Sequence, residues 1–437
     1  MDRVIKIPGK NRIPRVLIVF VIITTICLSL FNRSYVRNIS CFALLLYAMF
    51  LPIDDLACLI AAVFPTGKIF KLFGGYTVVP FLLLIYIFKT MVLNGRKVSM
   101  DVMRPIFWVM ILFVSTIITT TLLNISITGS LSFYAHLIFI IVALRINRIN
   151  RAESYDKISF YFIVSTLYVC AMTLVFPEVS RSLGNILYGR VNPGFSSSWD
   201  FGRSLIVSIA FVAVRFLKTK KRLFIDLVLV FIMLYFVVQC GRFSMVLGLA
   251  ALIFCMPLEY ISDKPKRERI LYFLFAMIMV SIIGALIYVY VYSSMAELRG
   301  VEASDNGRYG VWSTYLDYFL SNPQVICFGA GAGAISSVGA GLNTVTAHNI
   351  VIEKVAEVGL FGCFVLFCMF VNLYKGKIIN PTQNIYILPL ITFLGTTLTQ
   401  GTTGNETFAL LLAMCPSDQF DNSINLEDVN NENQTNL

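Results

Sequence analysis

The chain has 437 residues, of which 57% are hydrophobic and only 14% are charged, and its mean hydropathy is +0.79. Soluble domains carry about 25% charged residues, so this composition excludes an ordinary soluble protein. The net charge of +11 does not indicate nucleic-acid binding, because the basic residues gather in short loops between apolar segments. That distribution is the positive-inside pattern of membrane proteins.

Apolar segments of bilayer length follow one another along most of the chain. A bilayer core of roughly 30 Å requires about 20 apolar residues per helix. Such segments are predicted at 13–31, 39–53, 72–93, 105–124, 126–144, 158–176, 200–216, 223–239, 245–262, 270–292, 349–373 and 384–401. Two shorter apolar pieces, 56–65 and 405–415, are candidate half-spans or re-entrant segments.

These segments define the expected fold class, an all-α polytopic membrane helical bundle of about 12 spans and up to about 14 segments. Residues 1–415 are expected to form one transmembrane domain, and the polar tail 416–437 is predicted to be disordered. The first segment lacks a small-residue cleavage site, so it is predicted to be a retained span rather than a signal peptide.

The basic loops predict the orientation of the bundle. Lysines and arginines cluster between several spans, which places those loops in the cytoplasm. The parity of the spans then puts four segments on the outer face, namely 125–130, 177–199, 240–244 and 293–348. The last of these is a long polar loop in an otherwise apolar chain, and it is the expected location of the chemistry.

Two stretches of the long loop have a local pattern. Residues 310–320 carry apolar positions at helical spacing, with Trp312, Tyr315 and Phe319 on one face. The helix is predicted either to lie on the outer membrane surface or to cap the bundle. The glycine–alanine run 329–334 lacks the rest of a dinucleotide-binding motif, so it is predicted to let the backbone pass close to another surface.

Several arginines fall on the outer side or just inside the membrane, where the positive-inside bias disfavours them. A single arginine near a membrane edge is more often a snorkelling side chain than a ligand. Several on one face favour a phosphate-bearing ligand, because guanidinium groups stay charged and bind phosphate oxygens in a bidentate way. These residues are Arg181, Arg190, Arg203, Arg242, Arg299 and Arg308.

His348 ends the long loop and opens the next apolar helix. A histidine at such a junction, with arginines nearby, is a candidate general base. Asn349, Glu353 and Glu357 follow at a spacing of four residues and form one polar stripe. Acidic residues in a membrane helix favour a functional role, but a structural ion pair of Glu353 or Glu357 with Lys354 or a neighbouring arginine explains them equally well.

The ten cysteines show no metal-ligand spacing, and most lie within apolar runs as small packing residues. Cys240 and Cys327 both fall on the predicted outer side, so a disulfide between them is an alternative.

A set of motifs occurs in order along the second half of the chain. The main pattern is an arginine, a tryptophan-bearing helix, a proline, a Gly-x-Gly turn, and a His-Asn pair opening a helix with glutamate and glycine. Its positions here are Arg308, Trp312, Pro323, Gly329-Ala330-Gly331, His348-Asn349, Glu357 and Gly359. This pattern resembles the ligase/polymerase domain shared by bacterial O-antigen ligases and Wzy-type O-antigen polymerases. The segments GRVNPGFSSSW and GRFSMVLGLAAL are similar to other parts of that domain, so the likeness covers about residues 180–370.

The resemblance implies a GT-C-like helical fold in the bacterial inner membrane. It also implies a metal-independent, cofactor-free and inverting glycosyl transfer on the periplasmic face. The implied donor is a glycan linked to undecaprenyl pyrophosphate, and the implied product is O-antigen or capsular polysaccharide. The expected partners are the lipid-linked glycan, the bilayer and a chain-length regulator, but no nucleic acid.

The resemblance also assigns catalytic roles. Arg242 and Arg308 are expected to hold the leaving pyrophosphate in place of the divalent cation that other glycosyltransferases use. His348 is expected to accept the proton of the attacking sugar hydroxyl. For a polymerase, Glu302 or Asp305 is an alternative base.

The expected substrate-binding residues are Arg190 and Arg203, which add to the clamp, together with Asn349 and Glu357. Polymerase is favoured over O-antigen ligase, which would transfer the glycan to the lipid A core. A flippase is the alternative from another class, and it would need charges near the bilayer midplane and paired halves.

Overall fold

The structure is a computed structural model, and every regular element in its described part is a helix, as the all-α prediction requires. The described residues are 15–29, 34–66, 69–70, 77–93, 100–122, 137, 152–175, 198–219, 223–240, 243–261, 308–331, 338, 347, 349–374 and 384–397, with isolated residues in 265–285 and 407–414. The predicted spans 126–144 and most of 270–292, and the tail 416–437, lie outside them.

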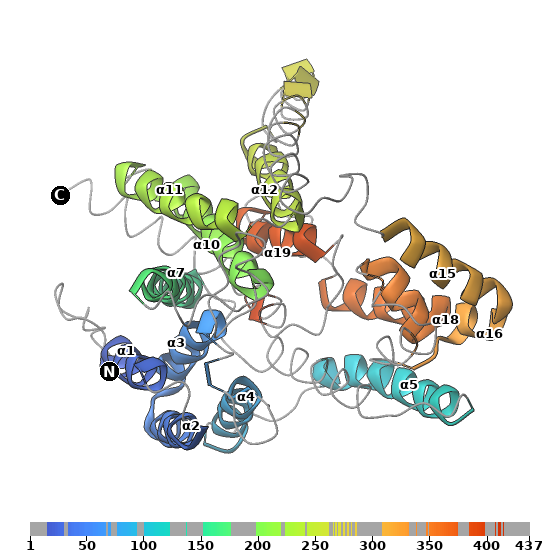
Figure 1. Ribbon diagram of the computed structural model, residues 1–437, viewed down its shortest axis with the longest axis horizontal. Coiled ribbons are helices and arrows are strands. Elements are labelled where there is room, and N and C mark those ends of the chain that lie inside the picture. Colours follow the sequence, from blue (N-terminus) through green and yellow to red (C-terminus); the bar gives the residue numbers. More distant parts are fainter. Residues whose placement is uncertain are drawn as a thin grey trace.

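The elements of the first half of the chain are α1 (Arg15–Ser29), α2 (Ser34–Phe50), α3 (Ile53–Val63), η1 (Phe64–Thr66), α4 (Val79–Phe88), η3 (Lys89–Leu93), α5 (Met100–Leu122) and α7 (Ala152–Val175). Helix α3 packs against α1, α4 and α7, whereas α5 lies apart from them beside α18 (Ile350–Tyr374) (Figure 1). The predicted half-span 56–65 is the buried part of α3 and η1, and it packs against α7. Neighbouring helices cover it on all sides, so it need not be long enough to cross a bilayer by itself.

The second half contributes the elements that position the candidate site. They are α10 (Ser198–Thr219), α11 (Leu223–Cys240), α12 (Phe243–Ile261), α15 (Arg308–Ser321), α16 (Pro323–Phe328), α18 (Ile350–Tyr374) and α19 (Asn384–Thr397). The bounds of α10, α11, α12, α18 and α19 lie within a few residues of the predicted spans. Cys327 carries a free thiol, so the alternative of a disulfide with Cys240 is wrong.

One described helical segment, Ser154–Val175, is both long enough and apolar enough to cross a membrane. Shorter apolar segments of 10–17 residues accompany it in the described part of the chain. They are Arg15–Cys27, Tyr35–Phe50, Val79–Val92, Ile106–Leu122, Leu223–Val237, Ser244–Met256 and Ile385–Thr397. The number of spans stays a prediction.

Helices α10, α12 and α19 lie together in the centre of the view (Figure 1). Gly248 of α12 and Gly395 of α19 let the two backbones approach closely, because a Cβ on Gly395 would lie 3.2 Å from the Cα of Gly248. Since Gly248 is near the start of α12 and Gly395 near the end of α19, the two helices run antiparallel. The starts of α10 and α12 therefore share one end of the bundle with the end of α19.

A separate unit of α15, α16, the turn 329–331 and α18 lies to one side, with α5 next to it (Figure 1). We call it the α15–α18 unit. Its small core contains Tyr315, Phe319, Val325 and Ala356, with Trp312 packed against it. The aromatic face predicted for 310–320 is thus confirmed as a shared face, and it is turned toward the protein rather than toward lipid.

Candidate functional site

The starts of α15 and α18 are joined by one hydrogen bond. The indole N–H of Trp312 donates to the carbonyl oxygen of Ala347 over 2.8 Å, and Ala347 is buried. Arg308 is the first residue of α15, one helical turn or about 6 Å along the axis before Trp312. The backbone at 308 is therefore brought to the same end of the unit as the residue that precedes His348.

Asn349 fixes the other side of His348. Its side-chain oxygen accepts hydrogen bonds from the backbone N–H groups of Val351 (2.9 Å) and Ile352 (3.3 Å). This is an N-terminal cap, which asparagine favours because its oxygen replaces missing intrahelical partners. The prediction that this residue pair opens a helix is confirmed. His348 itself lies outside the described residues, but both of its neighbours in the chain are held in place.

The glycine-rich turn 329–331 forms hydrogen bonds with α18 at the point where that helix is interrupted. We call this contact the glycine clasp. Gly359 has φ 66° and ψ −179°, so the helical path is interrupted between its two halves. The N–H groups of Ala330 and Gly331 donate to the carbonyls of Ala356 (2.7 Å) and Glu357 (2.8 Å) just before the break. These bonds satisfy carbonyls that the interruption deprives of their usual helical partners.

Only glycine fits at the two facing positions of this clasp, Gly329 in the turn and Gly359 in the interrupted helix. Gly329 has φ 76°, and a Cβ there would come within 3 Å of the backbone of Glu357. A Cβ on Gly359 would likewise overlap the backbone of Cys327. The prediction that the glycine–alanine run lets the backbone pass close to another surface is thus confirmed for residues 329–331, and the surface is α18.

The acidic stripe of α18 points into the protein. Glu353 and Glu357 are each 5% exposed, which is rare for carboxylates unless other charges compensate them. Lys354 forms an ion pair with Glu357, as the structural alternative predicted. Burial raises the pKa of the nearby Tyr315 phenol to about 12, and the carboxylates of Glu353 and Glu357 act in the same direction.

Arg203 approaches this stripe from α10. Its side chain is 3% exposed, so it does not snorkel to solvent, and its guanidinium carbon lies 5.4 Å from the centre of the Phe393 ring of α19. The carboxylates of Asp200 and Glu353 both contribute to the electrostatic field at this guanidinium. Arg203 is thereby linked to the first turns of α18, one turn after Asn349.

The start of α12 belongs to the same end of the bundle. A Cβ on Gly202 would lie 2.9 Å from the Sδ of Met245, so the residue before Arg203 packs against the first turn of α12. Arg242 directly precedes α12 in the chain. Arg242 itself lies outside the described residues, so its proximity to Arg203 stays a prediction.

The structure brings part of the predicted site together. Arg203 lies within electrostatic range of Glu353 in α18, the helix that also carries Glu357 and is capped by Asn349. The Trp312–Ala347 bond joins the helix that begins at Arg308 to the residue before His348. Sequence reasoning missed the contribution of Tyr315, whose helical spacing with aromatic residues marked it only as a packing position. The remaining predicted residues lie outside the described part of the chain: Arg190, Arg242, His348, Glu302 and Asp305.

Among the described residues, no group of three or more His, Cys, Asp or Glu side chains is placed to hold a metal ion. Comparisons with protein-family models, with curated proteins and with solved structures found no match.

Proposed function

We propose that this chain is a multi-pass glycosyltransferase of a bacterial inner membrane. It polymerises oligosaccharide repeat units linked to undecaprenyl pyrophosphate into O-antigen or capsular polysaccharide on the periplasmic side. The proposal combines the resemblance of residues 180–370 to O-antigen polymerases and ligases with the arrangement of residues around the start of α18.

Large apolar side chains on the outside of the helices support the membrane location. Phe50 of α2, Leu122 of α5 and Phe224 of α11 are each more than three-quarters exposed, and other apolar side chains on these helices are also exposed. Soluble monomers rarely expose contiguous apolar patches of more than a few hundred Å². A surface of this kind fits the acyl chains of a bilayer.

The observation that carries the proposal is the convergence at the start of α18. The Trp312–Ala347 hydrogen bond ties position 308 to the residue before His348, and Glu353 links the same helix to Arg203. Position 308 and the two chain neighbours of His348 therefore belong to elements that contact one another, which supports a site between them. Pyrophosphate is already a good leaving group, so positioning and charge stabilisation supply most of the catalysis.

In the proposed reaction, a hydroxyl of the acceptor repeat unit attacks the anomeric carbon of the donor glycan. The bond between that carbon and the pyrophosphate oxygen breaks, and the configuration at the carbon inverts. The hydroxyl proton passes to His348, and undecaprenyl pyrophosphate leaves. Arg242 and Arg308, with Arg190, balance its negative charge.

Arg203 and Glu357 also take part in electrostatic interactions within the protein, in addition to their predicted substrate contacts. The charge of Arg203 is set against that of Glu353, and Glu357 is paired with Lys354. The pair with Lys354 lies within α18 and stabilises the first half of the helix itself. Asn349 contributes in the same way through its cap.

Deletion of the gene in its own host tests the function. A polymerase leaves a lipid A core capped by a single repeat unit. Loss of all O-antigen, with polymer accumulating on the lipid carrier, identifies a ligase instead. Purified protein in vesicles with a lipid-linked glycan provides the second arm, because transport without formation of a glycosidic bond would overturn the enzymatic proposal in favour of a flippase.

A further inference from the structure

Helix α15 exposes a second apolar stripe along one border of its buried aromatic face, in line with Trp312. Leu316 and Leu320 lie four residues apart and are 54% and 75% exposed. Asp317 and Ser321, one position further along the chain, are also exposed and form a polar stripe beside the leucines. Because residues four apart lie one above the other on a helix, both stripes run parallel to its axis.

The two parallel stripes indicate how α15 is oriented relative to its surroundings. A helix that crosses a bilayer changes from apolar to polar at its ends, not along its length. A boundary that runs along the axis is instead the signature of a helix lying in the interface plane. The outward side of α15 therefore fits a surface that is apolar on one side of the axis and aqueous on the other.

The apolar surface continues onto the neighbouring helices. Phe328, the last residue of α16, is exposed, and its ring centre lies 6.1 Å from that of the half-exposed Phe361 in α18. Phe364 and Phe367 are also exposed on the second half of α18, a helix that coincides with the predicted membrane span 349–373. Phe328 thus connects the unit that contains α15 to a surface of phenylalanines suited to lipid.

We propose that α15 lies in the outer lipid–water interface, with Leu316 and Leu320 among the acyl chains and Asp317 in water. This inference rests on the multi-pass arrangement of the proposed function. It keeps the predicted alternative of a helix on the outer membrane surface and assigns the lipid contact to the two leucines, since the face of Trp312 and Phe319 packs on the protein core.

The inference gives the α15–α18 unit a further role. Since α15 carries position 308 at its start and holds Ala347 through Trp312, its depth in the interface sets the depth of the candidate site. A site held at the level of the headgroups meets the pyrophosphate of a lipid-linked glycan without lifting its polyprenyl chain from the bilayer. The unit is therefore expected to select membrane-embedded donors over water-soluble ones.

Site-directed spin labelling tests the placement directly. Full-length protein in which Cys327 and every other cysteine that the label reaches are replaced by serine is labelled at Leu320→Cys or, as the matched control, at Asp317→Cys. It is then reconstituted into phosphatidylethanolamine–phosphatidylglycerol vesicles. We expect the label at 320 to be accessible to oxygen and protected from a water-soluble nickel chelate, and the label at 317 to show the reverse.

Equal access of the nickel chelate to both positions would overturn the proposal, and so would dipolar broadening at 320, because it would mean that a second copy of the chain covers the stripe. A second measurement uses Leu316→Asp/Leu320→Asp, whose side chains are exposed and leave the core intact. Turnover of a long-chain lipid-linked donor should fall at least fivefold relative to that of a short-chain soluble analogue. Correct accessibility without any turnover would refute the proposed function alone.

Discussion

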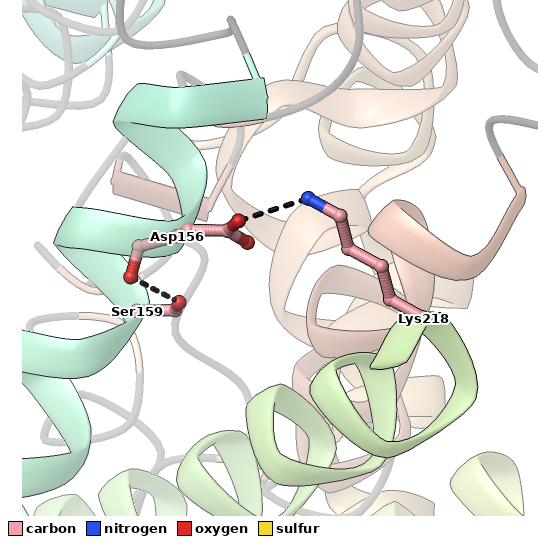
Figure 2. A network of polar contacts seen from close by, with 3 residues as sticks. All are labelled: Asp156, Ser159 and Lys218. Atoms are coloured by element: carbon pink, nitrogen blue, oxygen red, sulfur yellow. Dashed lines mark hydrogen bonds and ion pairs between the residues drawn. The ribbon is translucent and has the colours of Figure 1, made fainter. Parts of the chain in front are cut away.

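The two ends of α10 place their charges in different environments. Arg203 and Lys218 are about 22 Å apart along this helix, at 1.5 Å per residue. At the Lys218 end, Lys218 forms a 2.9 Å ion pair with Asp156 of α7, and Figure 2 shows that the backbone of Asp156 also accepts a hydrogen bond from Ser159. The Asp156 carboxylate is 55% exposed, so water shares in this network.

At the Arg203 end, by contrast, Arg203, Glu353 and Glu357 are almost completely buried. Solvated ion pairs contribute little and cost little, whereas buried charges carry a desolvation penalty of several kcal/mol per ion. The Lys218 end also has one buried carboxylate, that of Asp226, but Asp226 forms an ion pair with Arg215 of α10. Orientation of the bundle and local pairing therefore explain this end. The Arg203 end retains charges that packing alone would not favour, which is why we place the chemistry there.

Removal of the buried guanidinium is the strongest test of this contrast. Arg203→Met keeps the volume but leaves Asp200 and Glu353 without the compensating charge. We expect a loss of about 3–5 kcal/mol in unfolding free energy, measured by titrating mixed micelles with a denaturing detergent. The double variant Arg203→Met/Glu353→Gln should recover part of that loss. A single variant as stable as the parent would show that the two ends do not differ.

The variants Arg308→Ala and Arg242→Ala test whether the residues proposed to lie at the Arg203 end contribute to catalysis. Each removes a charge that is proposed to stabilise the leaving pyrophosphate, so polymerisation should fall by about 10²–10³-fold at unchanged protein level. Arg308→Lys should also fail, because an ammonium cannot replace the bidentate guanidinium. Lys218→Ala is the control at the other end. Persistence of full chain-length ladders in either arginine variant would contradict the clamp.

Much of this fold was predictable because lipid-length apolar segments and basic loops are local signals. The five helices α10, α11, α12, α18 and α19 follow the predicted spans closely. The break in α18 was not predictable in position, because a single glycine in an apolar helix is compatible with a continuous helix. Only the contact with residues 329–331 shows that Gly359 interrupts the path.

The candidate site was predictable as a set of residue types, but not as a set of contacts. The spacing of Asn349, Glu353 and Glu357 correctly gave one stripe on one helix face. It could not show that the stripe faces Arg203 of α10, since no local pattern relates helices separated by 150 residues of chain. The aromatic face of α15 was likewise correct as a pattern, but its partner depended on tertiary packing.

The glycine clasp offers a test of smaller size. Gly359→Ala places a Cβ against the Cys327 backbone and forces an alanine into a glycine-only conformation, with an expected cost of about 1–3 kcal/mol in unfolding free energy. Gly329→Ala should behave similarly. Gly310→Ala is the matched control, because nothing lies within 4 Å of a Cβ there and alanine favours the helix. Equal stability of all three variants would mean that the clasp does not constrain α18.

The Lys218 end should give the smallest effect. Lys218 lies 6.0 Å from the centre of the Tyr386 ring, in addition to its pair with Asp156. A partly solvated pair of this kind contributes about 0.2–1 kcal/mol, which a double-mutant cycle with Lys218→Met and Asp156→Asn measures. Because water replaces the lost partner in each single variant, polymerisation should be unchanged throughout the cycle. A coupling energy above about 2 kcal/mol would place this pair in the class of buried charges and remove the distinction between the two ends.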